Sequence, residues 1–171
     1  KGLAVSDAVL NLGSEGLVDV KASEGGIGVY ADKIQVSGGG TITVGKNGVG
    51  IYAKDSELNL EDISLNLYGD NSAGLYLSGN TKGTTKNNIT GSDTGSIGIF
   101  ADNITGTIEN GGRISLSGDK TIGIYSAGSN SITVNNNAGS EIKVGDSTNV
   151  SNPSIGIYSG NKGNTIINNG M

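Results

Sequence analysis

The sequence has no cysteine and no histidine among its 171 residues. Without cysteine, neither a disulfide framework nor a thiolate metal site can form. Without histidine, the chain lacks the commonest general base and metal ligand, and a serine–histidine–acid triad cannot be completed. These absences exclude the catalytic centres that need a thiol or an imidazole, and we expect a protein that is not an enzyme, with no catalytic residue and no cofactor.

Basic residues, proline and long apolar runs are also scarce. The net charge is −5, and Arg113 is the only arginine. Phosphate binding needs clustered lysine and arginine, so we expect no nucleic-acid partner. No apolar run approaches the about 20 residues that span a bilayer, so we expect this chain not to be inserted in a membrane. A single proline is too few for a linker, although the chain holds 31 glycines.

Aromatic residues are few, but six of the seven recur in one motif. The motif is five residues long, first seen as "IGVYA" in Ile27–Ala31, and returns in forms such as "VGIYA" and "IGIYS". Its aromatics are Tyr30, Tyr52, Tyr76, Phe100, Tyr125 and Tyr158, spaced by 22, 24, 24, 25 and 33 residues. Tyr68 alone lies outside it. Self-similarity at such a period indicates a solenoid.

The segments between the motifs have the pattern of short strands. Apolar residues lie two apart, as in Ile42/Val44 and Leu58/Leu60, which is the period of a strand with one buried face. Clusters of Gly, Asn, Asp and Ser separate them, as turns require. No segment has helical spacing across two turns. The sequence therefore predicts an all-β fold, a right-handed single-stranded parallel β-helix of about seven rungs of 22–25 residues, with three short strands per rung.

The repeat is irregular in two places. Between residues 77 and 96, Ile89 is the only large apolar residue after the motif, so weak second and third strands are predicted there. The last full turn is longer, chiefly at residues 145–154, and a solenoid tolerates such an insertion as a corner loop. We expect residues 1–171 to form one β-helical unit. Because the chain starts without methionine and stops within a repeat, we also expect it to be a piece of a longer protein.

The motif strand has two possible registers. Side chains alternate across a strand, so placing Ile27, Val29 and Ala31 inside puts Gly28 and Tyr30 outside. The opposite register would bury the rings and expose three aliphatic side chains per rung. A one-residue slip flips every side chain, so only one register can hold. We expect the first, with an external ladder of aromatic rings and a track of glycines beside it.

The tandem motif copies, set in Gly-, Asn-, Ser- and Thr-rich turns without cysteine, resemble the passenger regions of very large type Va autotransporter adhesins, the fusobacterial RadD-like group in particular. The resemblance covers most of the chain, from about Leu3 to Asn164. It implies export as part of a parent chain that is anchored at the bacterial cell surface by a C-terminal outer-membrane β-barrel. Some relatives carry a serine protease with a "GDSGS" motif. Here "GSDTGS" at Gly91–Ser96 is only loosely similar to that motif, and no catalytic residue is carried over.

From this resemblance we expect a non-enzymatic, surface-exposed adhesin segment or rigid stalk that contributes to attachment to host cells or other bacteria, with a surface protein or glycan as partner. The aromatic ladder is one candidate binding site, because tyrosine is favoured at interfaces. Alternatively, its rings only stack on one another and cover the backbone. The loop at 145–154, with Asp146, Asn149 and Asn152, is the second candidate, unless it is merely a tolerated insertion.

A carbohydrate-active β-helix, such as a polysaccharide lyase or a phage tailspike, is the alternative function. Such an enzyme needs convergent carboxylates. Asp32 and Asp102 follow the motif at the same position, but three rungs separate them by about 14 Å, too far for the paired acids of glycosidases. Glu61 and Asp62 are adjacent and should point to opposite faces if one strand runs through both. The calcium-binding nonapeptide of β-rolls is missing, so we expect no metal site.

Overall fold

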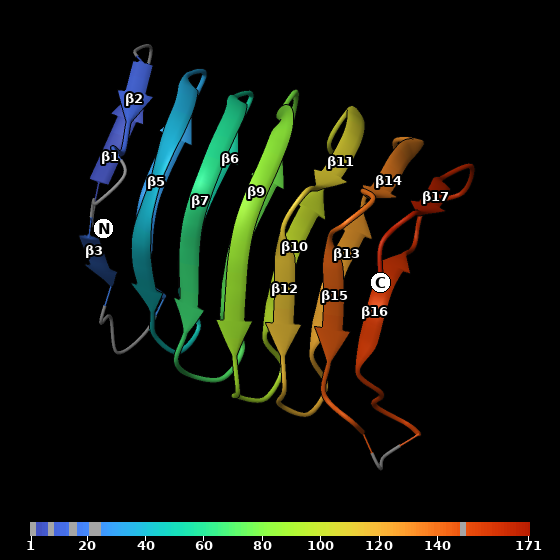
Figure 1. The fold of residues 1–171 in the computed structure, drawn as a ribbon. Coiled ribbons are helices and arrows are strands. Elements are labelled where there is room, and N and C mark those ends of the chain that lie inside the picture. Colours follow the sequence, from blue (N-terminus) through green and yellow to red (C-terminus); the bar gives the residue numbers. More distant parts are fainter. Residues whose placement is uncertain (1–2, 7–8, 14–16, 21–24, 148–149) are drawn as a thin grey trace.

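The computed structural model describes residues 3–6, 9–13, 17–20, 25–147 and 150–171, and every regular element in these ranges is a β-strand. The strands pair in parallel and wind into a β-solenoid of about five turns (Figure 1). The all-β parallel coil predicted from the sequence is confirmed. The predicted count of about seven rungs is somewhat too high, because it included partial rungs at both ends.

One sheet consists of the strands that carry the motif. In order along the solenoid axis these are β1 (Leu3–Ser6), β4 (Ile27–Asp32), β6 (Val49–Lys54), β8 (Ala73–Ser78), β10 (Ile97–Asp102), β13 (Ile122–Ala127) and β16 (Ile155–Ser159). Equivalent motif residues pair directly, so that Tyr52 lies between Tyr30 and Tyr76. The repeat period is therefore one turn of the coil.

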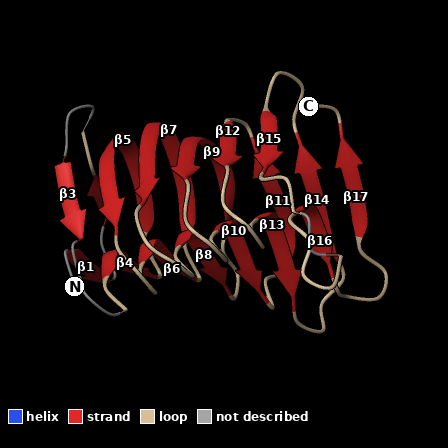
Figure 2. Cartoon of the chain, turned by 90° about the horizontal axis from the view of Figure 1, so that it is seen from below, coloured by secondary structure: helices blue, strands red, loops and turns tan. Residues whose placement is uncertain are grey.

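The second sheet faces the first (Figure 2). Its long path runs through β2 (Val9–Asn11), β5 (Gln35–Val44), β7 (Glu57–Leu67), β9 (Lys82–Gly91), β11 (Gly106–Asn110), β14 (Ile132–Asn136) and β17 (Thr165–Asn168). β3 (Leu17–Val20) pairs with β5, β12 (Arg113–Leu116) with β9, and β15 (Glu141–Val144) with β12. Each of the long strands β5, β7 and β9 thus fills the place that two strands, such as β11 and β12, fill in later turns.

A bend divides the long strands where the sequence predicted two separate ones. The pairing register shifts between Gly38 and Gly40 on β5 and between Glu61 and Ile63 on β7. Asp62 occupies the left-handed region at this bend, with φ of 54°. Consequently Glu61 and Asp62 are both exposed. They do not point to opposite faces, because the regular alternation is broken between them.

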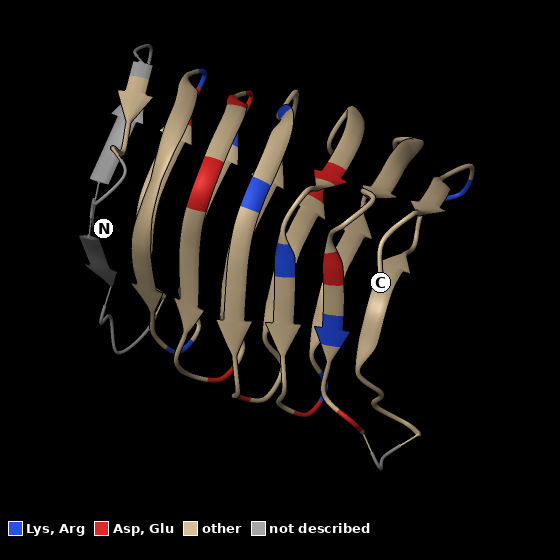
Figure 3. Cartoon of the chain, in the orientation of Figure 1, with Lys and Arg blue, Asp and Glu red and all other residues tan. Residues whose placement is uncertain are grey.

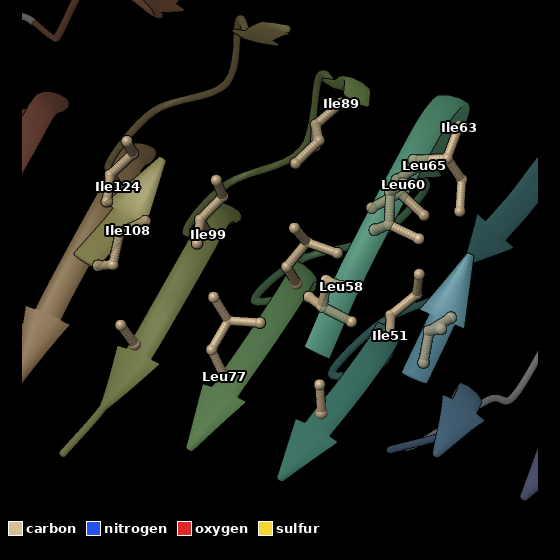
Figure 4. Close-up of a cluster of buried hydrophobic side chains, with 14 of the residues drawn as sticks. Ile51, Leu58, Leu60, Ile63, Leu65, Leu77, Ile89, Ile99, Ile108 and Ile124 are labelled. Atoms are coloured by element: carbon tan, nitrogen blue, oxygen red, sulfur yellow. The ribbon is translucent and has the colours of Figure 1, made fainter. Parts of the chain in front are cut away.

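The core is a column of aliphatic side chains between the two sheets (Figure 4). The third motif residue of each central turn is fully buried, as for Val29, Ile51, Leu75, Ile99 and Ile124. Leucine and isoleucine side chains from β5, β7, β9 and β12 fill the other side. This is the interior predicted for the third and fifth motif positions, and it is the main source of hydrophobic stabilisation.

The motif glycines lie on the opposite side from the one predicted. The motif strands share a burial pattern in which the glycine and the residue after it are both buried, while the first aliphatic residue is half-buried. A Cβ on Gly74 would lie 2.9 Å from Cδ1 of Ile89, and one on Gly50 would lie 3.2 Å from Cδ2 of Leu65. The glycines therefore face the core, and the opposing aliphatic side chains occupy the space that a methyl group would need.

The irregular stretch 77–96 forms a stronger strand than predicted. β9 runs over ten residues and pairs with β7 on one side and with β11 and β12 on the other. Thr85 and Asn87 replace aliphatic residues in its buried positions. The prediction of weak strands was wrong because the main-chain hydrogen bonds to β7, β11 and β12 run along the strand although two of its buried side chains are polar.

Buried polar residues are also stacked from turn to turn. Asn110 and Asn136 are fully buried, and the amide of Asn110 donates to the Oδ1 of Asn136 at 2.8 Å. The Asn136 amide donates in turn to Asn168, also at 2.8 Å. At another corner, the hydroxyls of Ser72 and Ser96 lie 3.2 Å apart. These ladders supply the partners that buried polar groups require.

Candidate functional site

The six motif aromatics form a column on the outer surface of the first sheet. The first five rings each follow a fully buried aliphatic residue on their strand and are only partly exposed, whereas Tyr158 follows the half-buried Ile157 and is exposed. The ring orientation predicted from the sequence is confirmed: the aromatics face outward, since the third and fifth motif residues face the core. We call this set, Tyr30, Tyr52, Tyr76, Phe100, Tyr125 and Tyr158, the aromatic column.

Neighbouring rings in the aromatic column are in direct contact. The centroid distances are 5.2 Å for Tyr30–Tyr52, 4.8 Å for Tyr52–Tyr76, 4.8 Å for Tyr76–Phe100, 5.1 Å for Phe100–Tyr125 and 4.9 Å for Tyr125–Tyr158. The tyrosine pairs are nearly parallel, with interplanar angles of 12° to 16°. Phe100 turns edge-on to Tyr76, at 72°. Such spacing matches the rise of a parallel sheet, about 4.8 Å per strand.

Two phenol groups of the column are tied to neighbouring rungs. The hydroxyl of Tyr76 donates to Oδ2 of Asp102 at 2.8 Å. Burial, together with this hydrogen bond and the charge of Asp102, raises the pKa of Tyr76 well above its ordinary value. Ser78 donates to the hydroxyl of Tyr52 at 3.5 Å. Both contacts reach from one turn to another, so they hold the stack together.

The packing of the column limits what it can bind. A sugar or a planar ligand stacks on an exposed ring face, but each internal ring has a neighbouring ring on either side along the column. Tyr158, at the last described ring contact, is the most exposed member, at 41%. The geometry therefore fits the alternative in which the rings stack on one another and cover the backbone. Binding along their edges, by a partner protein, stays a prediction.

The insertion at residues 145–154 connects β15 to β16, and its described parts, 145–147 and 150–154, extend beyond the lower edge of the coil in Figure 1. Asp146 and Asn152 are exposed, whereas Asn149 lies outside the described residues. The Ser147 hydroxyl donates to the carbonyl of Asn152 at 3.1 Å. β16 still pairs with β13 in full register, so the stack continues past the loop. Among the described residues, no hydrogen bond joins Asp146 to Asn152.

The carboxylates considered for catalysis stay apart. Asp32 and Asp102 occupy corresponding positions on β4 and β10, with β6 and β8 between them. Asp102 is engaged by Tyr76. Within the described ranges, no group of three or more His, Cys, Asp or Glu side chains is arranged to hold a metal ion. No helix in these ranges is long and apolar enough to cross a membrane.

A groove on the second sheet was not predicted. It crosses the carboxyl-terminal ends of β7, β9 and β12, has a volume of about 320 Å³, and is lined by Asn66, Tyr68, Thr90, Ser92, Ser115 and Ser117, with Leu67 and Gly91 also contributing. We call it the Tyr68 groove. Tyr68 is 65% exposed and is the aromatic outside the motif. The signal that could have revealed the groove is the alignment of small polar residues beside this unrepeated tyrosine.

The architecture is that of a parallel β-solenoid with two distinct aromatic surfaces, the stacked column and the single exposed Tyr68. Comparisons of the chain with protein-family models, curated proteins and solved structures found no match.

Proposed function

We propose that the chain is a non-enzymatic segment of a bacterial surface adhesin of the autotransporter type, in which it serves as a rigid stalk and contributes to attachment to host cells or other bacteria. The observation that carries the proposal is the unbroken stacking of the motif strands, from β1 through β16, in one parallel sheet. The resemblance of the motif copies to adhesin passengers gives the class of parent protein.

Stacking of this kind suits a stalk on physical grounds. In a solenoid each turn contacts only its neighbours, so stability is a sum of interfaces along one axis. Here four kinds of contact repeat along that axis: the aliphatic core, the aromatic column, the asparagine ladder and the hydroxyl pairs. All of them oppose bending or slippage between turns. A rod held together in this way can keep distal parts of a long protein away from a cell surface.

A bead assay tests whether the segment itself adheres. Beads coated with the purified chain are added to host epithelial cells and to bacteria, and retained beads are counted. Beads coated with the Ile99→Asp variant, in which a charge replaces a fully buried side chain, control for non-specific adhesion of unfolded protein. Retention above this control supports an adhesive segment, and equal retention restricts the proposal to the stalk.

A turnover assay tests the non-enzymatic part of the proposal. The chain is incubated with a panel of bacterial and host polysaccharides, and new reducing ends or unsaturated sugars are measured. We expect none above the level of the Ile99→Asp control. Sustained cleavage of any polysaccharide would replace the adhesin proposal with a carbohydrate-active β-helix.

A further inference from the structure

We propose that the Tyr68 groove is a binding site for a short, neutral oligosaccharide. The inference deepens the proposed function, on which it rests for its biological setting, by naming a site and a ligand class.

Tyr68 is the most exposed aromatic residue among those that the structure describes. In the aromatic column each internal ring has rings as neighbours, but the positions next to Tyr68 on adjacent strands are Gly45 and Ser92, which follow the paired residues Val44, Leu67 and Gly91. These small residues leave the phenol ring uncovered, consistent with its 65% exposure. An amphipathic ring exposed to this extent is a suitable platform for the apolar face of a sugar ring.

Hydrogen-bonding groups line the groove beside this ring. Asn66, Thr90 and Ser115 pair in register on β7, β9 and β12 and are each partly exposed. The Thr90 hydroxyl donates to Oδ1 of Asn66 at 3.1 Å, which fixes the amide and directs its nitrogen away from that bond. Among the described residues, neither this nitrogen nor the Ser115 hydroxyl has a hydrogen-bond partner. The amide nitrogen can therefore donate, and the Ser115 hydroxyl can donate or accept, a hydrogen bond with hydroxyl groups of a ligand.

The size of the groove matches more than one sugar ring. It crosses three successive strands, and two strand spacings measure about 10 Å. Its volume of about 320 Å³ lies at the lower end of the range of ligand sites, roughly 300–1,000 Å³. A short oligosaccharide aligned with the solenoid axis therefore fits the groove better than a single free sugar.

The charges around the groove favour a neutral ligand. None of its lining residues is charged, and the lower halves of β7, β9 and β12 carry no charged residue in Figure 3. The turns just beyond them hold three carboxylates, Asp70, Asp93 and Asp119, against one lysine, Lys120. Asp93 accepts a hydrogen bond from the Gly69 amide at 2.8 Å. These carboxylates repel sialylated, sulfated or uronic-acid glycans. Arg113, two residues before Ser115 on β12, is paired with Glu141 at 2.7 Å, and Lys143 lies in register with Ser115 on the next strand.

The test is a binding titration of the purified chain with neutral tri- and tetrasaccharides of glucose, galactose, mannose and their N-acetylated forms, set against sialylated and sulfated counterparts. We expect binding to at least one neutral probe and weaker binding to its anionic counterparts. Tyr68→Ala should lower the affinity about tenfold or more by removing the stacking face, while Tyr68→Phe should keep most of it. Ser115→Leu, which fills the groove, should also abolish binding.

Tyr158→Ala is the matched control, because Tyr158 is also an exposed tyrosine but lies in the aromatic column on the other sheet. Its affinity should equal that of the unchanged chain. Circular dichroism establishes that each variant keeps its strands. If Tyr68→Ala loses its fold, Ser115→Leu and Tyr68→Phe still decide the question.

Three outcomes would overturn the inference: no binding to any neutral probe, affinity unchanged within about twofold in both Tyr68→Ala and Ser115→Leu, or loss of binding in Tyr158→Ala alone. None of them affects the stalk. If bead attachment persists without saccharide binding, the proposed function stands and the Tyr68 groove is not its site. If saccharides bind at Tyr68 but beads do not attach, the site stands and the adhesive role fails.

Discussion

Substitution of Gly98 by alanine tests the placement of the motif glycines against the core. A Cβ at this position would lie 2.5 Å from the carbonyl oxygen of Gly123 and 2.7 Å from Cγ2 of Ile114. Neither atom can yield easily, since the carbonyl belongs to the neighbouring motif strand and Ile114 is fully buried. Gly98 is not in the left-handed region. Alanine can therefore adopt the backbone conformation of Gly98, and the loss of stability comes from steric overlap of the added methyl group alone.

The expected magnitude is a balance of two effects. Overpacking a well-packed core costs about 1–3 kcal/mol. Replacing glycine where the backbone permits it returns about 0.4–1 kcal/mol by restricting the unfolded chain. We expect Gly98→Ala to lower the free energy of unfolding by about 1–2 kcal/mol. For a chain of this size, that corresponds to a fall in Tm of about 2–8 °C.

Gly156→Ala is the control, because it has the same place in the motif but no atom within 4 Å of its Cβ position. It should be neutral or slightly stabilising. Urea unfolding followed by far-ultraviolet circular dichroism measures both variants. Equal stability of Gly98→Ala and Gly156→Ala would refute the inward placement. A further check is the double variant with Ile114→Ala, which should lose less than the sum of the single losses, because the two side chains compete for the same space.

The remaining predictions concern the core and the aromatic column. Ile99→Asp places an unpaired charge at a fully buried position and should abolish the strand signal in circular dichroism; a folded variant would contradict the interior. Tyr52→Ser removes two ring contacts, each worth about 0.5–1.5 kcal/mol, so a loss as large as that of Ile99→Asp would contradict the outward ring. Asn87 is 2% exposed and neither of its amide atoms has a partner among the described residues, so Asn87→Leu should raise unfolding stability by about 1–3 kcal/mol; a loss would mean that an internal water binds the amide. Burial and Asp102 raise the pKa of Tyr76, so its stabilising effect is complete below the unfolded pKa near 10 and is lost as pH rises further. Tyr76→Phe should therefore lose less stability than the unchanged chain between neutral and strongly alkaline pH, and identical profiles would refute the coupling.

The sequence was sufficient for the architecture because one physical signal repeats in it. Each turn must place an aliphatic residue such as Ile51 or Ile99 in the same narrow interior, so the period of the motif is the period of the coil. The pairing of Tyr52 with Tyr30 and Tyr76 follows from this. The parallel all-β solenoid could therefore be predicted without any homologue.

The position of the glycines could not be predicted from alternation alone. Strand periodicity assigns Gly50 to the face of Tyr52, but the strand departs from regular alternation at the glycine. The Cβ position of Gly50 lies 2.6 Å from the carbonyl oxygen of Gly74 and 3.2 Å from Cδ2 of Leu65 on the opposite sheet, so both neighbours require a glycine here. Glycine has no side chain whose polarity could indicate which face of the strand it occupies. Only the residues across the core reveal it, and they are distant in sequence.

The same reasoning explains why the candidate site differs from the one predicted. Repetition drew attention to the aromatic column, but in a solenoid a repeated side chain contacts its own copies in the turns above and below. Tyr125, for instance, has the ring of Phe100 at 5.1 Å and that of Tyr158 at 4.9 Å between centroids. The ring surface of a repeated aromatic is therefore covered by its own copies. Tyr68 has no copy in the neighbouring turns, and its ring is open for that reason. In a coil of this kind, residues that follow the repeat stabilise the rod, and those that depart from it are the ones left free to bind.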